Sequence, residues 1–202
     1  IEIDEKDPYK RFYFPRRKVL QPVVNAYQEI YDGKLDFLSV SQPKRTGKTT
    51  GGLKLAQMMG GRDPDGSIFA VGKGEGLVKR FYGGLLQGFE TDSTYQRFLN
   101  VFPEATKIGE NYKSAENLSI DLKKKNIFPT FTCRPIDGAI VGCTEANVLV
   151  YIDDCVKNHE EARNRDRLEF LCEKVTDDVL GRRLEGTPII IQGTKYSLYD
   201  PI

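Results

Sequence analysis

The segment Gln42–Thr50 (QPKRTGKTT) constrains the fold of this chain more than any other part of the sequence. Its Gly47-Lys48-Thr49 matches the end of the pattern G-x-x-x-x-G-K-[ST], although Gln42 replaces the first Gly. In loops of this pattern, backbone N–H groups and the N-terminus of the next helix point at a phosphate group. The Lys reaches the β- and γ-phosphate oxygens, and the hydroxyl group coordinates Mg²⁺. The segment therefore predicts a site for the phosphates of ATP.

The sequence on either side of this loop has the order of elements that such a site requires. A short apolar strand is expected over Asp36–Val40, and a helix is expected from the loop to about Met59, where two glycines end it. Ser67–Val71 has the pattern of a second buried strand. A strand, a helix and a strand form a βαβ unit, so we expect the two strands to be parallel.

The loop carries two cations in addition to Lys48. Lys44 and Arg45 stand next to the expected triphosphate, where a positive charge in cis can stabilise the transition state as an arginine finger does. We expect one of the two to have this role; the sequence leaves open which, and the alternative is that they face solvent. The residues expected to contact the nucleotide are Gln42, Pro43, Lys44, Arg45, Thr46, Gly47, Lys48, Thr49 and Thr50.

A second candidate site follows the apolar run Val148–Ile152, which suits a strand buried on both faces. This strand ends in Asp153-Asp154. A carboxylate at such a position is the expected partner of a phosphate-binding loop, because it holds the magnesium ion and its water shell. We assign Asp153 to the metal and Asp154 to polarising the attacking water, with Glu160 or Glu161 as alternative carboxylates.

The rest of the sequence indicates an α/β protein with one domain over residues 1–202. We expect a mainly parallel central sheet flanked by helices, with an added antiparallel hairpin. Further helices are expected over Val23–Ile30, Leu77–Phe89, Thr94–Phe102 and His159–Val175. Further strands are expected over Asn117–Leu122 and Ile127–Cys133, which form the hairpin, and over Thr187–Gln192, which ends in Gly193-Thr194.

Composition excludes several classes of protein. Hydrophobic residues make up 39% of the 202 residues, yet no apolar run approaches the roughly 18 residues of a membrane span. The first residues lack the apolar core of a signal peptide, and because the chain begins without Met and stops at Ile202, we expect a piece of a longer polypeptide. The net charge is only +1, so DNA contacts are expected from local clusters, Arg16–Lys18 or Lys123–Lys125, which otherwise form solvated surface.

The cysteines do not indicate a metal centre. Cys133, Cys143, Cys155 and Cys172 have no paired zinc-ligand spacing, and His159 is the only histidine. We therefore expect reduced thiols, and no zinc.

Three separated blocks of the sequence together resemble one protein family. The loop lacks the first Gly and carries basic residues, and the Asp153-Asp154 strand is followed by Glu160-Glu161-Ala162. A further apolar strand ends in Gly193-Thr194, followed by Tyr196 and Asp200. In these features the chain is similar to the ATPase domain of phage terminase large subunits, the motors that package viral DNA. The resemblance extends from Phe37 to the C-terminus.

This resemblance implies a P-loop NTPase of the additional-strand, RecA-like class. In that class the Thr187–Gln192 strand lies between the loop strand and the Val148–Ile152 strand. The resemblance implies that ATP is hydrolysed with Mg²⁺, and that Thr194 senses the γ-phosphate and couples hydrolysis to motion. It also implies an adenine contact from a Gln in an N-terminal lid segment, residues 1–34, for which Gln21 is the candidate and Gln28 the alternative.

The partners implied by the resemblance are those of a packaging motor. They are double-stranded DNA, further copies of the chain in a ring, expected to be a pentamer, on the portal of a procapsid, and the small terminase subunit. The expected location is the cytoplasm of the host cell. Complete terminases also carry a C-terminal nuclease of the RNase H type, which is not part of this chain, so we expect no DNA cleavage from it.

The chain departs from the family pattern at three points. Lys44 stands where many members have Arg, so the cis finger could be Arg45, and Asp154 stands where the usual residue is Glu. The Arg that many members have before the Asp153 strand is missing, and Arg134 is the nearest upstream substitute for a finger that acts on the neighbouring subunit.

Three other functions remain open from the sequence. One is a different nucleic-acid motor, such as a helicase. Another is a small-molecule phosphotransferase, for which Arg163, Arg165 and Arg167 could form an arginine-rich lid. The third is a nucleotide-binding switch without turnover.

Overall fold

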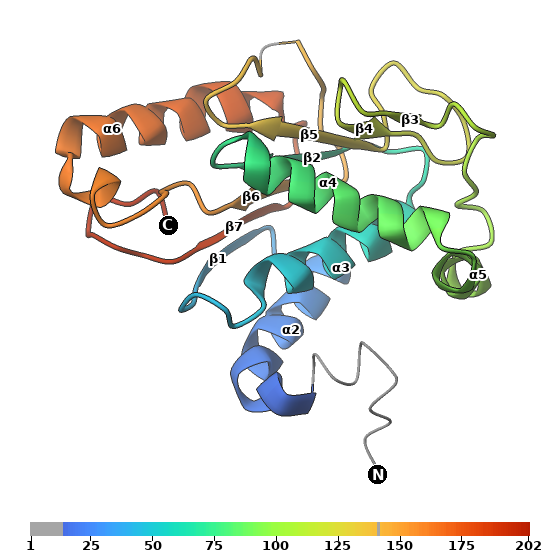
Figure 1. Ribbon diagram of the computed structural model, residues 1–202, viewed down its shortest axis with the longest axis horizontal. Coiled ribbons are helices and arrows are strands. Elements are labelled where there is room, and N and C mark those ends of the chain that lie inside the picture. Colours follow the sequence, from blue (N-terminus) through green and yellow to red (C-terminus); the bar gives the residue numbers. More distant parts are fainter. Residues whose placement is uncertain (1–13, 141) are drawn as a thin grey trace.

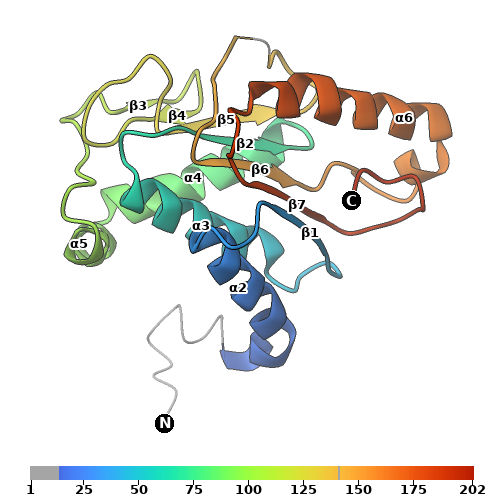
Figure 2. The same cartoon turned by 180° about the vertical axis from the view of Figure 1, so that it is seen from behind.

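A computed structural model describes residues 14–140 and 142–202 of the chain. They form an α/β structure around one mixed sheet of seven strands, in the order β1-β7-β6-β2-β5-β4-β3 (Figure 1). Helices cover both faces of this sheet, as the view from behind also shows (Figure 2). A mostly parallel sheet between helices is the predicted fold class, and it is compatible with the RecA-like arrangement.

Five of the strands are parallel, and two short strands extend the sheet in the antiparallel sense. The predicted position of the last strand is confirmed, because β7 pairs with β1 on one side and β6 on the other. The parallel strands are β1 (Phe37–Ser41), β2 (Ile68–Gly72), β5 (Phe131–Pro135), β6 (Leu149–Asp153) and β7 (Ile189–Gly193). The antiparallel strands are β3 (Lys113–Ser114) and β4 (Ser119–Ile120).

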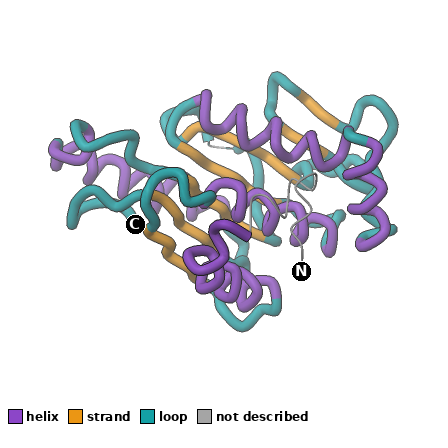
Figure 3. Tube along the Cα trace, turned by 60° about the horizontal axis from the view of Figure 1, so that its bottom comes forward, coloured by secondary structure: helices purple, strands orange, loops and turns teal. Residues whose placement is uncertain are grey.

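The helices divide between the two faces. Four helices pack on one face: α2 (Arg17–Tyr31), α3 (Lys48–Arg62), α4 (Glu75–Glu90) and α5 (Asp92–Val101). The other face is covered by α6 (Arg165–Glu173) and the short helices η2 (Glu161–Arg163) and η3 (Lys174–Val179). Two further short helices are η1 (Phe14–Arg16) and η4 (Leu180–Arg182). In Figure 3 the strands run between these helices.

The central strands are buried on both faces, which explains their continuous apolar sequences. Along β6, Tyr151 belongs to the core shared with α2, α3 and α4, whereas Val150 and Ile152 belong to the core shared with α6. Along β7, Ile190 faces the first core, whereas Ile189 and Ile191 face the second. Successive side chains of a strand point to opposite faces, so each strand supplies both cores.

One predicted helix, His159–Val175, is wrong as a single element. The structure breaks it at Asn164, between η2 and α6, and continues it past Val175 as the π-helix η3. The side chain of Asn164 accepts a hydrogen bond of 3.0 Å from the backbone N–H of Arg167, and therefore caps the start of α6. A polar residue that bonds to the backbone favours a new helix start over a continuous helix.

Other elements differ from the prediction only in their bounds. The helix expected over Val23–Ile30 begins at Arg17 and contains Pro22. The hairpin pairs β4 with β5 in the predicted antiparallel sense, but β4 has only the two residues Ser119–Ile120. Leu118 and Lys123, on either side of β4, have positive φ (44° and 61°).

Two general features complete the description. None of the described helices is both long enough and apolar enough to cross a membrane. All four cysteines are free thiols, and the described residues hold no group of three or more His, Cys, Asp or Glu side chains that could bind a metal ion.

Candidate active site

The candidate site is formed at the carboxyl ends of three neighbouring parallel strands. β1 leads into the Gln42–Gly47 loop, β6 ends at Asp153, and β7 ends at Gly193. The carboxyl ends of parallel strands meet at one edge of a sheet, which is where open α/β folds bind ligands. Three chain segments that are far apart in sequence therefore converge on one place.

The loop between β1 and α3 is shaped by two residues with left-handed backbone conformation. Gly47 has φ of 102° immediately before the first residue of α3, and Arg45 has φ of 65°. The hydroxyl group of Thr46 donates a 2.9 Å hydrogen bond across the loop to the Pro43 carbonyl. The positive φ at Gly47 is accessible to glycine without steric cost, which accounts for glycine at this position.

Lys48 is the first residue of α3, and its side chain is turned into the loop. The residue is buried, at 7% exposure, and its ammonium group donates to the carbonyl oxygens of Gln42 (2.9 Å) and Pro43 (3.3 Å). It also donates to the hydroxyl of Thr194 at 3.0 Å. A buried charge requires such partners, and they hold the ammonium group between the loop and the end of β7.

Thr49 and Asp153 lie side by side, as the sequence predicted for a shared metal. The Thr49 hydroxyl donates to Asp153 Oδ2 at 2.7 Å, and the Gln192 amide donates to Asp153 Oδ1 at 3.1 Å. Burial raises the pKa of the Asp153 carboxyl to about 6, against the lowering effect of the Thr49 hydrogen bond, and the charge of Asp154 adds to the rise. A hydroxyl and a carboxylate whose hydrogen bonds come from neutral groups are hard oxygen ligands that fit Mg²⁺.

Asp154 and Thr194 connect the ends of β6 and β7. Asp154 has a left-handed backbone, with φ of 44°, and its carboxylate accepts a 3.2 Å hydrogen bond from the backbone N–H of Thr194. The Thr194 hydroxyl donates to the Gln42 carbonyl at 3.1 Å. Thr194 therefore contacts the loop, Lys48 and Asp154 at once.

The other predicted cations and carboxylates lie around this centre. Lys44 and Arg45 are exposed, and the Lys44 ammonium lies 5.4 Å from the centre of the Tyr196 ring. Glu160 is exposed before η2, whereas its neighbour Glu161 forms ion pairs with Lys73 (2.9 Å) and Arg167 (3.1 Å). These ion pairs give Glu161 a structural role that Glu160 does not share.

Arg134, the substitute for a finger acting on a neighbouring subunit, is held within its own chain. Its guanidinium group donates to the backbone carbonyls of Asn117 and Cys133. It lies on β5, which is separated from β7 in the sheet by the two strands β6 and β2.

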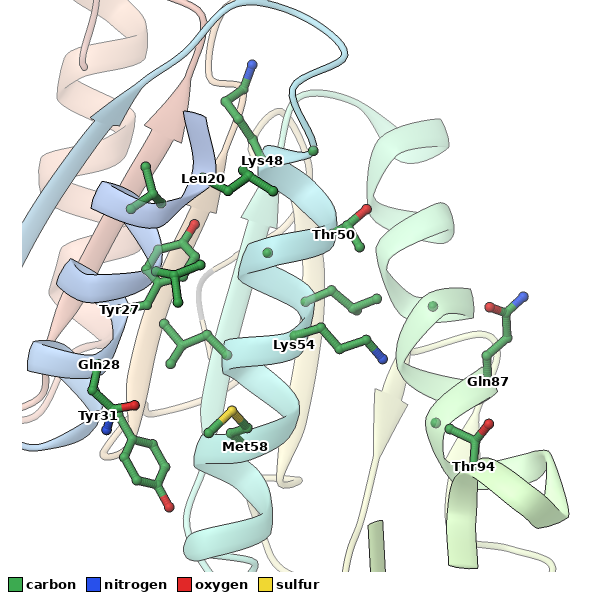
Figure 4. Close-up of a pocket in the computed structure, with 18 of the residues that line it drawn as sticks. Leu20, Tyr27, Gln28, Tyr31, Lys48, Thr50, Lys54, Met58, Gln87 and Thr94 are labelled. Carbon is green, nitrogen blue, oxygen red and sulfur yellow. The ribbon is translucent and has the colours of Figure 1, made fainter. Parts of the chain in front are cut away.

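A pocket of about 820 Å³ adjoins the loop and continues along α3. Gly47, Lys48 and Thr50 line its end at the loop, and residues of α2, α4 and α5 form its walls (Figure 4). Gln28 lines this pocket and donates to Asp32 at 2.8 Å. Gln21 is not among the lining residues, and its amide donates to Asn25 at 2.8 Å. Of the two predicted adenine contacts, only Gln28 faces the pocket.

Sequence reasoning missed the buried polar groups beneath the site. Gln192 lies at 0% exposure within the apolar strand β7, and it bonds to Tyr27 of α2 and Tyr151 of β6 as well as to Asp153. An amide side chain at the end of the run Ile189–Ile191 is the signal that could have indicated this network, because a fully buried Gln needs partners.

Comparison with known proteins adds no relative at this point. No protein-family model matches the chain, and no curated protein sequence is significantly similar to it.

Proposed function

We propose that this chain is a Mg²⁺-dependent ATPase domain of the additional-strand, RecA-like P-loop class, and that it hydrolyses ATP to ADP and phosphate. The observation that supports this most is the convergence of Lys48, Thr49 and Asp153 with Thr194 at one edge of the sheet. The pairing of the Thr49 hydroxyl with the Asp153 carboxylate, 104 residues apart in the chain, is the arrangement that a shared magnesium ion requires.

Each residue has a role that follows from its position. The loop backbone and the start of α3 bind the phosphates, and Lys48 exchanges its carbonyl partners for phosphate oxygens. Thr49 and Asp153 would hold Mg²⁺, which would supply positive charge that stabilises the phosphate groups. Asp154 orients the attacking water, and Thr194, which contacts both Lys48 and Asp154, couples the γ-phosphate to the end of β7. Lys44 or Arg45 supplies the additional positive charge.

The biological step rests on the sequence resemblance. We propose that hydrolysis drives double-stranded viral DNA into a procapsid, as the ATPase domain of a terminase large subunit. This function involves a homo-oligomeric ring on the portal, the small terminase subunit, and the cytoplasm of an infected host cell. The three sequence blocks in their family order are the support for this step.

The phosphotransferase alternative has less support. Two of the three arginines that could form a lid have partners in the same chain: Arg165 pairs with Glu169 at 2.8 Å, and Arg167 pairs with Asp137 at 2.7 Å. An arginine lid needs guanidinium groups that can close on a substrate, whereas Arg167 joins α6 to Asp137 and Arg165 pairs within α6.

The test is ATP hydrolysis with and without double-stranded DNA. We expect Mg²⁺-dependent release of phosphate, increased by DNA, and loss of release in Lys48→Ala, because the buried ammonium group is the main cation of the loop. Circular dichroism checks that the variant folds. Unchanged turnover in Lys48→Ala means that this loop is not the site. A phosphorylated small molecule in place of free phosphate contradicts the motor, and ATP binding without turnover indicates a switch.

A further inference from the structure

One buried amide connects three elements beneath the site. The Gln192 carbonyl oxygen accepts a hydrogen bond from the hydroxyl of Tyr27, which belongs to α2. Its nitrogen donates to Asp153 Oδ1 at 3.1 Å and to the hydroxyl of Tyr151. An amide side chain has one acceptor and two donor hydrogens, so these contacts give every hydrogen of the amide a partner.

The residues of this network are buried, and the Gln192 amide has one defined orientation within it. Tyr27, Tyr151, Asp153 and Gln192 are exposed by 6%, 1%, 3% and 0%. Asp153 Oδ1 needs a donor, so the amide nitrogen faces it and the amide oxygen must face Tyr27. Burial, together with the charge of Asp153, raises the pKa of the Tyr27 hydroxyl, which therefore stays protonated and donates at neutral pH.

Helix α3 packs against the network at the Tyr151 hydroxyl. A Cβ atom added at Gly52 would lie 2.1 Å from the Tyr151 hydroxyl, so the helix packs directly on that group. The Tyr151 ring also stacks on Phe81 of α4, with ring centres 5.0 Å apart. Tyr151 therefore has little freedom to move away from Gln192.

The network reaches α2, which forms one wall of the large pocket. Tyr27 lines this pocket and lies between α2 and α3 in Figure 4. Helix α2 also contacts the loop, because the Gln42 amide donates to the Val19 carbonyl at 3.4 Å. The same helix thus adjoins the pocket, the phosphate loop and the network below Asp153.

We infer that Gln192 is a positioning residue for the Asp153 carboxylate, and that Tyr27 links this carboxylate to α2. Gln192 holds Asp153 Oδ1 so that Oδ2 stays beside Thr49, and Tyr27 holds the opposite end of the same amide by donating to its oxygen. One wall of the pocket is thereby connected to the proposed metal ligand through Gln192. This inference rests on the proposed function, because it concerns the metal that accompanies the nucleotide.

The test measures metal affinity, separately from catalysis. Mn²⁺ binding to the ADP-bound chain is followed by electron paramagnetic resonance in Tyr27→Phe and Gln192→Met. We expect affinity to fall about tenfold in Tyr27→Phe and by up to about a hundredfold in Gln192→Met, as for other partners that orient metal ligands. ADP affinity without metal, measured in EDTA, should stay unchanged, because Tyr27→Phe keeps the ring that lines the pocket.

Tyr82→Phe is the matched control. It also removes a buried hydroxyl group, but this group has no hydrogen-bond partner among the described residues and is not part of the network. We expect Tyr82→Phe to bind Mn²⁺ as the wild type does. Thermal unfolding of all variants shows whether Gln192→Met folds. If this variant does not fold, the Mn²⁺ affinity of Tyr27→Phe decides whether the network positions Asp153.

The outcomes separate this inference from the proposed function. Wild-type Mn²⁺ affinity in Tyr27→Phe overturns the link to α2, and wild-type affinity in Gln192→Met overturns the positioning role. An equal loss of metal-free ADP affinity means that the network is only structural, which also overturns it. If the unaltered chain binds no Mn²⁺ with ADP and Lys48→Ala behaves identically, the proposed function itself is wrong.

Discussion

Asp154 follows Asp153, the proposed metal ligand, and accepts a hydrogen bond from the backbone N–H of Thr194, a position that suits its proposed role in orienting water. Asp154→Asn keeps the shape of the side chain but removes its basicity. We expect ATP binding to remain and hydrolysis to slow by at least about a hundredfold, on the scale of a lost general base. Glu160→Gln is the matched change at an exposed carboxylate, and should have little effect. Single-turnover experiments measure the hydrolysis rate of both variants, and nucleotide titration measures their ATP affinity. A greater loss of hydrolysis rate in Glu160→Gln would assign the water-orienting role to Glu160.

The two loop cations differ in their surroundings. The Lys44 ammonium lies over the Tyr196 ring, whereas Arg45 has a left-handed backbone at the turn of the loop. We therefore expect Arg45 to be the cis finger, so that Arg45→Ala lowers kcat by about a thousandfold, and Lys44→Ala lowers it much less. Steady-state phosphate release gives kcat and KM for each. A larger loss in Lys44→Ala assigns the finger to that residue.

At the scale of residues, the sequence predicted the site residues that belong to a recognisable pattern. Lys48 and Thr49 follow from the loop pattern, and Asp153 follows from its place at the end of an apolar strand. Tyr27 and Gln192 were not predicted, because 165 residues separate them and nothing in either local sequence indicates the other. Such contacts depend on which strands and helices become neighbours, and that is a property of the folded chain.

At the scale of elements, an ion-pair network ties the ends of β2 and β5 to η2 and α6. Lys73, after β2, pairs with Asp137 (3.1 Å) and Glu161 (2.9 Å), and Arg167 of α6 pairs with the same two carboxylates. The Lys73 side chain is only 9% exposed and that of Glu161 15%. Removing one partner of a largely buried pair leaves a charge without compensation, which is costly.

We predict that Lys73→Met lowers the free energy of unfolding by about 1–3 kcal/mol, somewhat less than for a fully buried pair. Lys79→Met is the matched control, because Lys79 forms an exposed pair with Glu75 on α4, and such pairs contribute less than about 0.5 kcal/mol. Urea unfolding at pH 7 measures both. Equal effects would mean that the Lys73 network is worth no more than a surface ion pair.

The stability that Lys73 contributes through its pairs with Glu161 and Asp137 should depend on pH in a definite direction. Burial alone would raise the pKa of Glu161 and Asp137, but the hydrogen bonds from Lys73 and the other donors outweigh it, and the pKa of each is lowered. A lowered pKa gives stability that is present above the unfolded value and is lost as the pH falls through the folded value. We therefore expect the difference between wild type and Lys73→Met to be largest near neutral pH and to shrink below about pH 4. A constant difference would contradict this.

The elements themselves were mostly predictable, for a physical reason. Buried parallel strands need continuous apolar runs, so β2, β6 and β7 are visible in the sequence. The long helix expected over His159–Val175 was not resolved into its parts, because the cap at Asn164 competes with helical continuation over only a few residues. The edge strand β3, with only the two residues Lys113–Ser114, was not predicted, because it carries too little sequence for a period to be recognised.

At the scale of the whole molecule, the site joins distant parts of the chain. Lys48 and Thr49 come from its first third, and Asp153, Gln192 and Thr194 come from its last third. Lys48 and Thr49 begin α3, which follows β1, and the other three lie at the ends of β6 and β7. β1, β7 and β6 are neighbours in the sheet, and β6 and β7 supply both cores. A ligand that bridges these residues therefore stabilises contacts that only the complete fold provides.

We accordingly predict that Mg²⁺ and ADP together shift the global unfolding transition. At a ligand concentration of a hundred times Kd the added stability should be about 2.7 kcal/mol. The circular dichroism signal of the whole sheet and hydrogen exchange at β6 and β7 should report the same gain, because the ligand binds to the folded site and not to either half. Lys48→Ala should lose this gain at equal ligand concentration. A gain limited to α2 and α3 in hydrogen exchange would show that the nucleotide contacts the pocket without engaging Asp153 and Thr194.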